Sequence, residues 1–477
     1  MFIIFTVLIY FLLLFALSQL TTKSGGNDGF FRGAKRSPWY MVAFGMIGAS
    51  ISGVTFVSVP GMVMQIDMTY LQTCIGFIAG YFAVAFILLP IYYRHNLTSI
   101  YTFLGQRMGE RSHQTASWFF LLSKMTGAAL RFYVPCFILQ RFVLQPLGIP
   151  FAATVICMVL LIWLYTRRGG IRTLVWTDSF QTFCMLVALL LIIYNVAGSL
   201  GMGIMDAAEA IACNEQSRMF VFDDWFTTQN FWKQFVSGIF IVIVMTGLDQ
   251  DMMQKNLTCK SLRDAQKDMC TYGLAFVPVN LLFLSLGILL TLLASQNGVP
   301  LPADGDQLLP MFAATGKLGP MVQILFTIGI IAASFSSADS ALTSMTTCYS
   351  IDIRKDDGNE KARRRAHITV SLVFAVFIIL IDSLNSTSII DAVYTLCSYT
   401  YGPLLGMFAF SILCRRKVCD RHVPYIALAA PLACFIVNKA TMYFTGYQFG
   451  YELLLLNGLI VFLVLLTDST KQESHKQ

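Results

Sequence analysis

The stretch MVQILFTIGIIAASFSSADSALTSMTTCYS, residues 321–350, decides the fold, because it is apolar and long enough to cross a membrane. Hydroxyl groups and one acid, Asp339, nevertheless interrupt its middle. At helical spacing one face carries four small residues, namely Ala333, Ser336, Ser337 and Ser340. Polar groups in hydrocarbon need partners, and oxygen ligands suit small hard cations. This face predicts a cation site; the alternative is close packing between helices, which does not require a buried acid.

The composition is that of a polytopic membrane protein. Of the 477 residues, 56% are hydrophobic and only 12% are charged, whereas a soluble domain has about 25% charged residues. The 12 cysteines lie mostly inside apolar runs, without the spacing of a metal site or a disulfide framework. We therefore expect no enzyme: with five histidines and no nucleophile–base pairing in the sequence, an intramembrane hydrolase has no support.

Hydropathy predicts an all-α protein with about thirteen transmembrane helices. We place them at 1–20, 39–65, 70–93, 117–145, 149–166, 172–198, 229–248, 270–296, 319–348, 366–383, 387–414, 423–440 and 447–467. The first segment lacks the basic start and the cleavage site of a signal peptide, so we expect a retained span.

The positive-inside rule places the N-terminus outside and the C-terminus in the cytoplasm. The connections of the inner side hold most of the basic residues, which are Lys23, Arg32, Lys35, Arg36, Arg94, Arg107, Arg111, Arg167, Arg168, Arg172, Lys255, Lys260, Arg263, Lys267 and those of 354–365 and 415–421. The outer side has few: Arg141, Arg218, Lys233, Lys317 and Lys439. The net charge of +7 is therefore topological, and we expect no nucleic-acid partner.

Two predicted spans contain residues that interrupt a helix. They are AFGMIGASISGVTFVSVPG at 43–61 and SGIFIVIVMTGLDQDMMQ at 237–254. Breaks free backbone carbonyls, which is tolerated at membrane depth where they line a cavity or a ligand; a glycine-rich packing helix is the alternative. The two segments lie five spans apart, which favours inverted repeats. The predicted parts are a peripheral helix and inner loop at 1–38, repeats at 39–198 and 229–414, an outer loop at 199–228, and two peripheral helices with a tail at 415–477.

Two acids lie at similar depth in the predicted spans. Asp178 in GGIRTLVWTDSFQT is roughly 10 Å from the inner end of its span, and Asp339 is roughly 14 Å from the inner end of its own. An acid buried in a span indicates a functional site. We expect both to border one ion site; for Asp178, pairing with a neighbouring Arg or Trp is the alternative.

Two cations, Lys124 and Arg131, share one face of the span at 117–145. Lys124 can snorkel to the inner surface. Arg131 lies near mid-membrane and either pairs with Asp178 or Asp339 or meets an anionic group of a substrate. The span at 387–414 adds a polar-aromatic set suited to a polar solute: Asp391, Tyr394, Thr395, Ser398, Tyr399 and Tyr401.

These motifs together resemble the sodium:solute symporter family. They are GASISGVTFVSVPG (48–61), LTSIYTFLGQRMG (97–109), GGIRTLVWTD (169–178), TGLDQDMMQKNLT (246–258) and AASFSSADSALTS (332–344) followed by SIDI. The resemblance implies a LeuT-like fold of five plus five helices, in which the first and sixth core helices are broken and access alternates.

The resemblance also implies site residues. The family's shared sodium site corresponds to Gly48, Ile51, Ala333, Ser336 and Ser337. A second site of some sialic-acid carriers corresponds to Asp178, Ser336, Asp339 and Ser340. Where a serine is expected this chain has Asp339, which leaves three possibilities: sodium, a proton or an ion pair with Arg131. The substrate set is Ser50, Ser52, Thr55, Arg131, Ser398 and Tyr399.

We therefore predict a secondary active symporter in the inner or plasma membrane, acting as a monomer. It uses Na+ to import a small polar organic solute, with sialic acid or a sugar favoured, and it needs no covalent chemistry. The alternatives are proton coupling through Asp178 and Asp339, or a non-transporting sensor or channel on the same fold.

Overall fold

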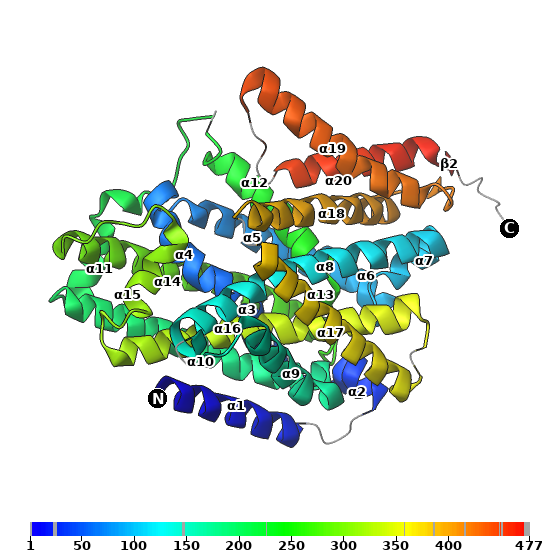
Figure 1. Cartoon of the computed structure of the whole chain (residues 1–477). Coiled ribbons are helices and arrows are strands. Elements are labelled where there is room, and N and C mark those ends of the chain that lie inside the picture. The colour runs from blue at the N-terminus through cyan, green and yellow to red at the C-terminus, as the bar shows by residue number, and fades with distance from the viewer. Residues whose placement is uncertain are drawn as a thin grey trace.

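The computed structural model of the chain describes residues 2–471, except 22–25, 146–147, 226, 357, 385–386, 415, 448 and 450–451. Within these residues the protein is a bundle of helices, with one two-stranded pairing of β1 (Arg416–Lys417) and β2 (Thr470–Lys471) (Figure 1).

The helices follow the predicted spans in order. Up to the predicted outer loop they are α1 (Phe2–Thr21), α2 (Asn27–Arg32), α3 (Trp39–Ser50), α4 (Gly53–Ile66), α5 (Tyr70–Ala83), η2 (Val84–Leu88), α6 (Leu89–Arg94), α7 (Thr102–Arg107), α8 (Glu110–Leu139), η3 (Gln140–Leu144), α9 (Phe151–Gly169) and α10 (Ile171–Ser199). The later ones are α11 (Ile204–Ala212), α12 (Phe231–Val242), η6 (Ile243–Gly247), α13 (Gln250–Asn256), α14 (Leu262–Gln296), α15 (Leu308–Ala313), α16 (Pro320–Cys348), η8 (Tyr349–Ile353), α17 (Glu360–Leu384), α18 (Thr387–Leu413), α19 (Val423–Thr445) and α20 (Glu452–Asp468).

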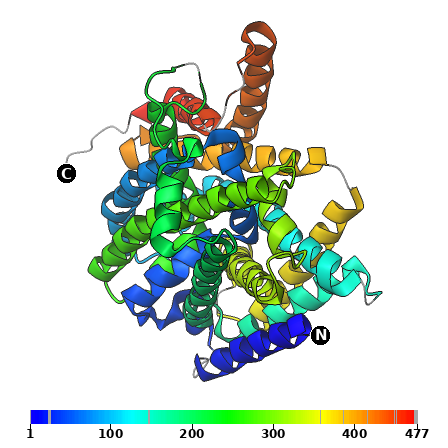
Figure 2. The same ribbon diagram turned by 90° about the vertical axis from the view of Figure 1, so that its left-hand side faces the viewer.

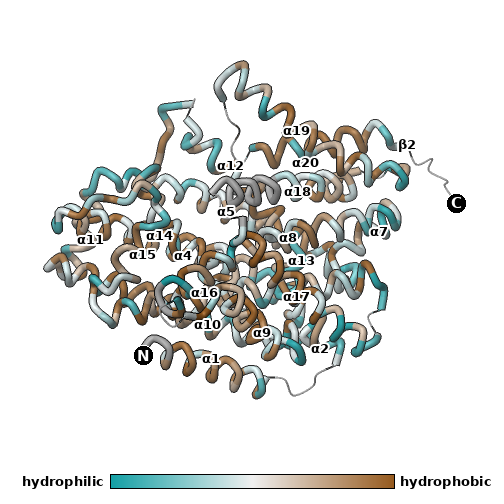
Figure 3. Tube along the Cα trace, viewed as in Figure 1, coloured by the Kyte–Doolittle hydropathy of each residue, from teal (hydrophilic) through white to brown (hydrophobic). Residues whose placement is uncertain are grey.

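The bundle has the hydropathy of a membrane protein. Among the described residues seven helices are long and apolar enough to cross a membrane, or nine if each bent pair counts as one span. The predicted count of thirteen is therefore not confirmed. Figure 3 shows hydrophilic residues gathered at the two ends of the bundle, around α11 at one end and around α7 and α2 at the other.

Both predicted helix breaks are present. Between α3 and α4 the axis bends by 65°, and between the helix ending at Gly247 and α13 it bends by 71°. At the first break Ile51 has φ −86° and ψ 94°, and the Ser52 side chain caps α4 by accepting from the Thr55 amide. At the second break Asp249 is extended and accepts from the Asp251 amide, which starts α13. Each bend is therefore a helix end followed by a capped helix start.

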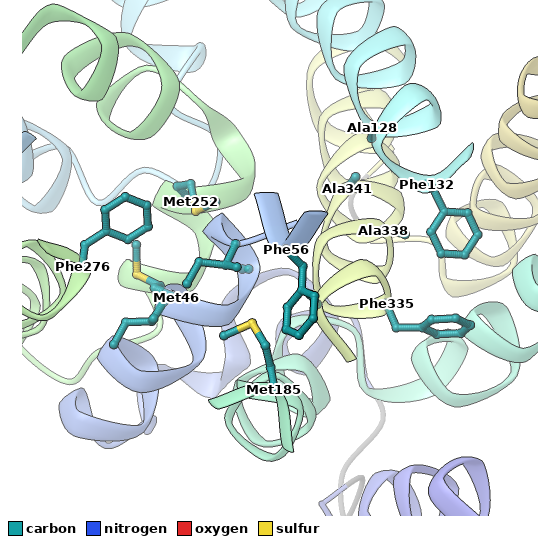
Figure 4. Packing of buried hydrophobic residues seen from close by; sticks show 14 of the residues in the cluster. Met46, Phe56, Ala128, Phe132, Met185, Met252, Phe276, Phe335, Ala338 and Ala341 are labelled. Carbon is teal, nitrogen blue, oxygen red and sulfur yellow. The ribbon is translucent and has the colours of Figure 1, made fainter. Parts of the chain in front are cut away.

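Helix α16 passes both breaks near the middle of the bundle. It packs against α10, α8, α3, α4 and α13. Figure 4 shows Ala128 of α8 and Ala341 of α16 where these two helices meet, and the rings of Phe132 and Phe335 are 5.4 Å apart. Helix α1 lies at one edge of the bundle and α19 and α20 lie at the opposite edge (Figures 1 and 2). The central helices thus bring Asp178, Ser336, Asp339 and Ser340 into the protein interior.

Candidate sodium and substrate site

The first break lies directly against the hydroxyl face of α16. Ser337 Oγ donates to the Ala49 carbonyl at 3.0 Å and to the Ala333 carbonyl at 3.2 Å. A Cβ at Gly53 would lie 2.2 Å from Ser334 Oγ, so only glycine allows this approach. One hydroxyl and two carbonyls converge here, and such neutral oxygens are ligands that a small hard cation accepts.

The Ala49 carbonyl is available because the helix stops. In a continuous helix the amide four residues later, that of Gly53, would bond it, but α3 ends at Ser50 and α4 begins at Gly53. The sequence-based set contains Gly48 and Ile51 but not Ala49. Ala49 could have been found from the sequence, because it lies four residues before Gly53, where the second helix begins. Gly48 itself packs on α10, where a Cβ would lie 2.0 Å from Thr182 Oγ1.

Asp178 and Asp339 lie close together, as predicted from their depths. Ser340 Oγ is 3.4 Å from Asp178 Oδ2 and 3.3 Å from Asp339 Oδ1, so one hydroxyl bridges the two acids. Ser336 Oγ donates to Asp178 Oδ1 at 3.1 Å. Ser336 therefore faces the acid of α10, whereas Ser337 faces the first break.

Two lysines lie where the sequence did not predict them. Lys255 was expected in an inner loop, but α13 carries it into the interior, where it is 1% exposed and its Nζ is 2.7 Å from Asp178 Oδ2. Lys124 was expected to snorkel to the surface, but it is buried. Its Nζ lies 2.7 Å from Asp251 Oδ2 and 3.2 Å from Asp249 Oδ1. Buried carboxylates provide partners that a surface position would lack.

Tyrosine hydroxyls occupy the free carbonyls of the second break. Tyr92 donates to the Gly247 carbonyl at 2.8 Å, and Tyr101 donates to the Leu248 carbonyl at 3.0 Å. The Tyr101 segment is held in turn by Gln250, whose Oε1 accepts from the Ile100 amide at 2.9 Å. The motif at 97–109 thus packs against this break through Tyr101 and the Ile100 amide.

Arg131 of α8 is half-buried, and α8 packs against α4 and α16. Pro135, one turn later on α8, has its Cδ 3.5 Å from the Cβ position of Gly53. Of the two alternatives given for Arg131, an ion pair with Asp178 or Asp339 is not found in the described part of the structure. Among the described residues Asp178 pairs with Lys255, and Asp339 Oδ2 accepts from the Tyr165 hydroxyl at 2.6 Å. Neither acid neutralises the guanidinium, which leaves it available for an anionic group.

The hydroxyls predicted to face substrate have mixed environments. Ser50 Oγ hydrogen-bonds the Tyr272 hydroxyl, Ser52 caps α4, and Thr55 is half-buried at the start of α4. The side chain of Ser398 lies outside the described residues. Tyr399 lies elsewhere: its ring is 6.2 Å from that of Phe435 and packs with residues of α19 and α20. Of the predicted substrate residues whose side chains the structure describes, those on the first break and α8 therefore stay in the candidate site, and Tyr399 does not.

Comparison with known proteins decides the family. The profile described as "Sodium:solute symporter family" matches residues 30–419. The chain belongs to the sodium:solute symporter family. Sodium is therefore its coupling ion, and this symporter is an integral membrane transporter and not an enzyme.

Individual relatives agree with this assignment. The symporter is 26% identical to the sodium/sialic acid symporter NanT of Aliivibrio fischeri, over 87% of this chain and 83% of that one. It is 24% identical to the sodium/sialic acid symporter SiaT of Proteus mirabilis, over 88% and 86%. The human sodium/iodide cotransporter is 23% identical over 87% of this chain and 66% of its own.

Solved structures confirm the LeuT-like fold. The structure of a Na+-coupled sialic acid symporter, in a substrate-bound outward-open state, matches with a TM-score of 0.84 and 21% identity over 99% of each chain. Mhp1, a nucleobase-cation-symport-1 family transporter in a closed conformation, matches with a TM-score of 0.59 and 16% identity over 94% of each chain. At these identities the likeness concerns the fold alone.

Proposed function

We propose that this symporter uses inward sodium flow to import sialic acid or a closely related acidic sugar. The observation that carries the proposal is Arg131, a half-buried guanidinium on the helix that packs against α4 and α16, while Asp178 and Asp339 are bound by other groups. A half-buried guanidinium favours a counter-charge nearby, and the carboxylate of an acidic sugar would supply it. Two of the relatives are sodium/sialic acid symporters, which supports the same solute class.

The proposed sodium site joins the first break to α16. Its ligands are the carbonyls of Ala49 and Ala333 and the hydroxyl of Ser337, which already converge. The Ser337 hydroxyl can rotate to present a lone pair to a cation. The carbonyls of Gly48 and Ile51 and the hydroxyl of Ser336 complete the set inferred from the family resemblance.

The proposed solute site lies on the other side of the same break. Arg131 binds the solute carboxylate through a bidentate pair of hydrogen bonds, which a lysine cannot form. The hydroxyls of Ser50, Ser52 and Thr55 offer donors and acceptors for the sugar. We omit Tyr399 from this site because its ring packs on α19 and α20.

Sodium and solute share one broken helix, and this couples them. A cation between α3 and α16 fixes the break that presents Ser50 to Thr55, so each ligand favours the conformation that the other binds. We place the N-terminus outside and the C-terminus in the cytoplasm, with a monomer as the working unit. Each sodium ion that enters then gains about 2.3 kcal/mol per 100 mV of membrane potential.

Proton coupling through Asp178 and Asp339 has less support. The Lys255 ammonium lies 2.7 Å from Asp178 and neutralises this acid. Sodium is the coupling ion of the family. Transporters rather than sensors or channels are found among the relatives, so a solute carrier is the function that the site favours.

The proposal is tested by calorimetric titration of the purified protein with N-acetylneuraminate, in sodium buffer and in potassium buffer of equal ionic strength. We expect saturable binding in sodium and binding at least about tenfold weaker in potassium, equivalent to about 1.4 kcal/mol of coupling. Equal affinity in both buffers would contradict the shared break as the coupling element. Binding of a neutral hexose in place of the acid would contradict the role of Arg131.

A further inference from the structure

The position predicted for a second cation already contains a positive charge of the chain itself. Lys255 projects from α13, and its Nζ lies 2.7 Å from Asp178 Oδ2. Asp178 is fully buried, and Lys255 is 1% exposed. The pair is therefore closed off from solvent.

The oxygens around this carboxylate form the ligand set that a sodium ion would use. Ser336 Oγ is 3.1 Å from one carboxylate oxygen, and Ser340 Oγ is 3.4 Å from the oxygen that faces Lys255. One carboxylate and two hydroxyls suit a small hard cation. An ammonium has the same charge, and at 2.7 Å it forms an ion pair with the carboxylate. It would repel a sodium ion at the same oxygens.

The neighbouring acids have closer partners of their own than Lys255. Asp251, one turn earlier on α13, has Lys124 Nζ 2.7 Å away. Asp339 accepts from the Tyr165 hydroxyl at 2.6 Å. In the described part of the chain Asp178 is thus the acid that Lys255 neutralises.

We infer that the Lys255 ammonium is the permanent second cation of this site, so that the protein binds and carries one sodium ion per cycle, at the first break. The inference rests on the proposed function, since it specifies the sodium stoichiometry of the same transport cycle. A tethered cation completes the site electrostatically but cannot be released inside. It therefore contributes nothing to the driving force, and the solute gradient is limited to what one ion supports.

Sodium binding tests the inference without any solute. The purified full-length protein is titrated with radiolabelled sodium in a scintillation proximity assay, calibrated to the amount of protein. We expect one saturable sodium ion per wild-type chain. The variant Lys255→Gln removes the ammonium and leaves the oxygens of Asp178, Ser336 and Ser340 for a second sodium ion, so we expect it to bind two.

Two variants serve as controls. Lys255→Arg keeps a positive charge at the site, and we expect one sodium ion as in the wild type. Lys260→Gln makes the same chemical change at an exposed lysine five residues later, and we also expect one. Two sodium ions in the wild type would overturn the inference, as would a single ion in a folded Lys255→Gln protein. If Lys255→Gln does not fold, the wild-type number alone decides.

Transport separates failure of this inference from failure of the proposed function. At zero membrane potential, a tenfold inward sodium gradient should hold N-acetylneuraminate at about tenfold accumulation for one ion and about hundredfold for two. About tenfold accumulation supports the inference, and about hundredfold overturns it. If no accumulation occurs, the proposed solute fails, and the sodium binding ratio still decides the role of Lys255. If neither the wild type nor Lys255→Gln binds sodium saturably, both the proposed sodium site and this inference are wrong.

Discussion

The two broken helices bend by similar angles but are completed by different chemistry. At the first break a free carbonyl, that of Ala49, meets the hydroxyl of Ser337. At the second break the carbonyls of Gly247 and Leu248 are each bonded by a tyrosine hydroxyl. The free carbonyl of the first break thus meets a hydroxyl that can itself coordinate a cation. The free carbonyls of the second break are instead hydrogen-bonded by tyrosine side chains.

The charged residues around the two breaks differ as well. Helix α13, which follows the second break, is fixed by Lys124 on Asp249 and Asp251 and by its own Lys255 on Asp178. Near the first break the cation is Arg131, two turns after Lys124 on α8, and the acids Asp178 and Asp339 have other partners. The comparison teaches that the second break is held by cations that belong to the chain, whereas the proposed function assigns the ligands of the first break to mobile sodium and solute.

The largest effect is expected from removing the fixed cation of the second break. Lys124→Met leaves Asp249 and Asp251 buried without their ammonium, so the free energy of unfolding should fall by about 3–5 kcal/mol. The melting temperature of the purified protein in detergent measures this. The exposed Lys260→Met is the matched control and should change stability by less than about 0.5 kcal/mol. Equal melting temperatures for the two variants would mean that the ion pairs of Lys124 with Asp249 and Asp251 do not stabilise α13.

The next effect separates the two cations of α8. Arg131→Ala should leave folding intact but weaken N-acetylneuraminate binding by about 2–5 kcal/mol, the cost of losing one partner of a buried charge pair. Calorimetric titration in sodium measures the change. Arg141→Ala, at an exposed position in η3 just after α8, should retain wild-type affinity. Unchanged affinity in Arg131→Ala would remove this residue from the solute site.

The close approach at the first break can be tested by adding one methyl group. Gly53→Ala places a Cβ 2.2 Å from Ser334 Oγ, and such overpacking costs about 1–3 kcal/mol. Ser334→Ala removes the atom in conflict, so the double variant should recover most of the lost stability in thermal unfolding. Failure of the second change to rescue the first would show that α4 does not press on α16 at this serine.

A smaller effect should follow from removing one proposed sodium ligand. Ser337→Ala should raise the sodium concentration at half-saturation at least about tenfold, or about 1.4 kcal/mol, while the melting temperature stays near that of the wild type. Ser344→Ala is the matched control, because its hydroxyl donates to the Ala341 carbonyl of the same helix at 3.0 Å. Wild-type sodium affinity in Ser337→Ala would contradict the placement of the ion at the first break.

Much of the fold could be predicted because the bilayer imposes long apolar segments and makes interruptions conspicuous. Both breaks follow from glycine and polar residues in otherwise apolar spans. The meeting of Asp178 and Asp339 follows from their similar depths, since helices of known direction convert sequence distance into height. The thirteen predicted segments each correspond to helical structure, although hydropathy in the structure marks fewer of them as spans.

The errors concern contacts that depth and periodicity do not determine. The positive-inside rule counted Lys255 with the inner loops, because a lysine after a polar DQD segment resembles a span end. The structure instead continues α13 to Asn256 and buries Lys255 against Asp178. Likewise, the snorkelling of Lys124 assumed no buried partner, and the second break supplies two. The sequence signal for such buried lysines is a polar segment just after a helix break. The acid that pairs with the lysine lies on a different helix.

Uptake of radiolabelled N-acetylneuraminate into proteoliposomes tests the central claim most directly. Vesicles that contain the protein are given an inward sodium gradient, and matched vesicles receive potassium in place of sodium. We predict accumulation above the external concentration with sodium, collapse of this accumulation when a sodium ionophore dissipates the gradient, and no accumulation with potassium. Equal uptake in sodium and potassium, or accumulation driven by a proton gradient alone, would contradict sodium coupling at the first break.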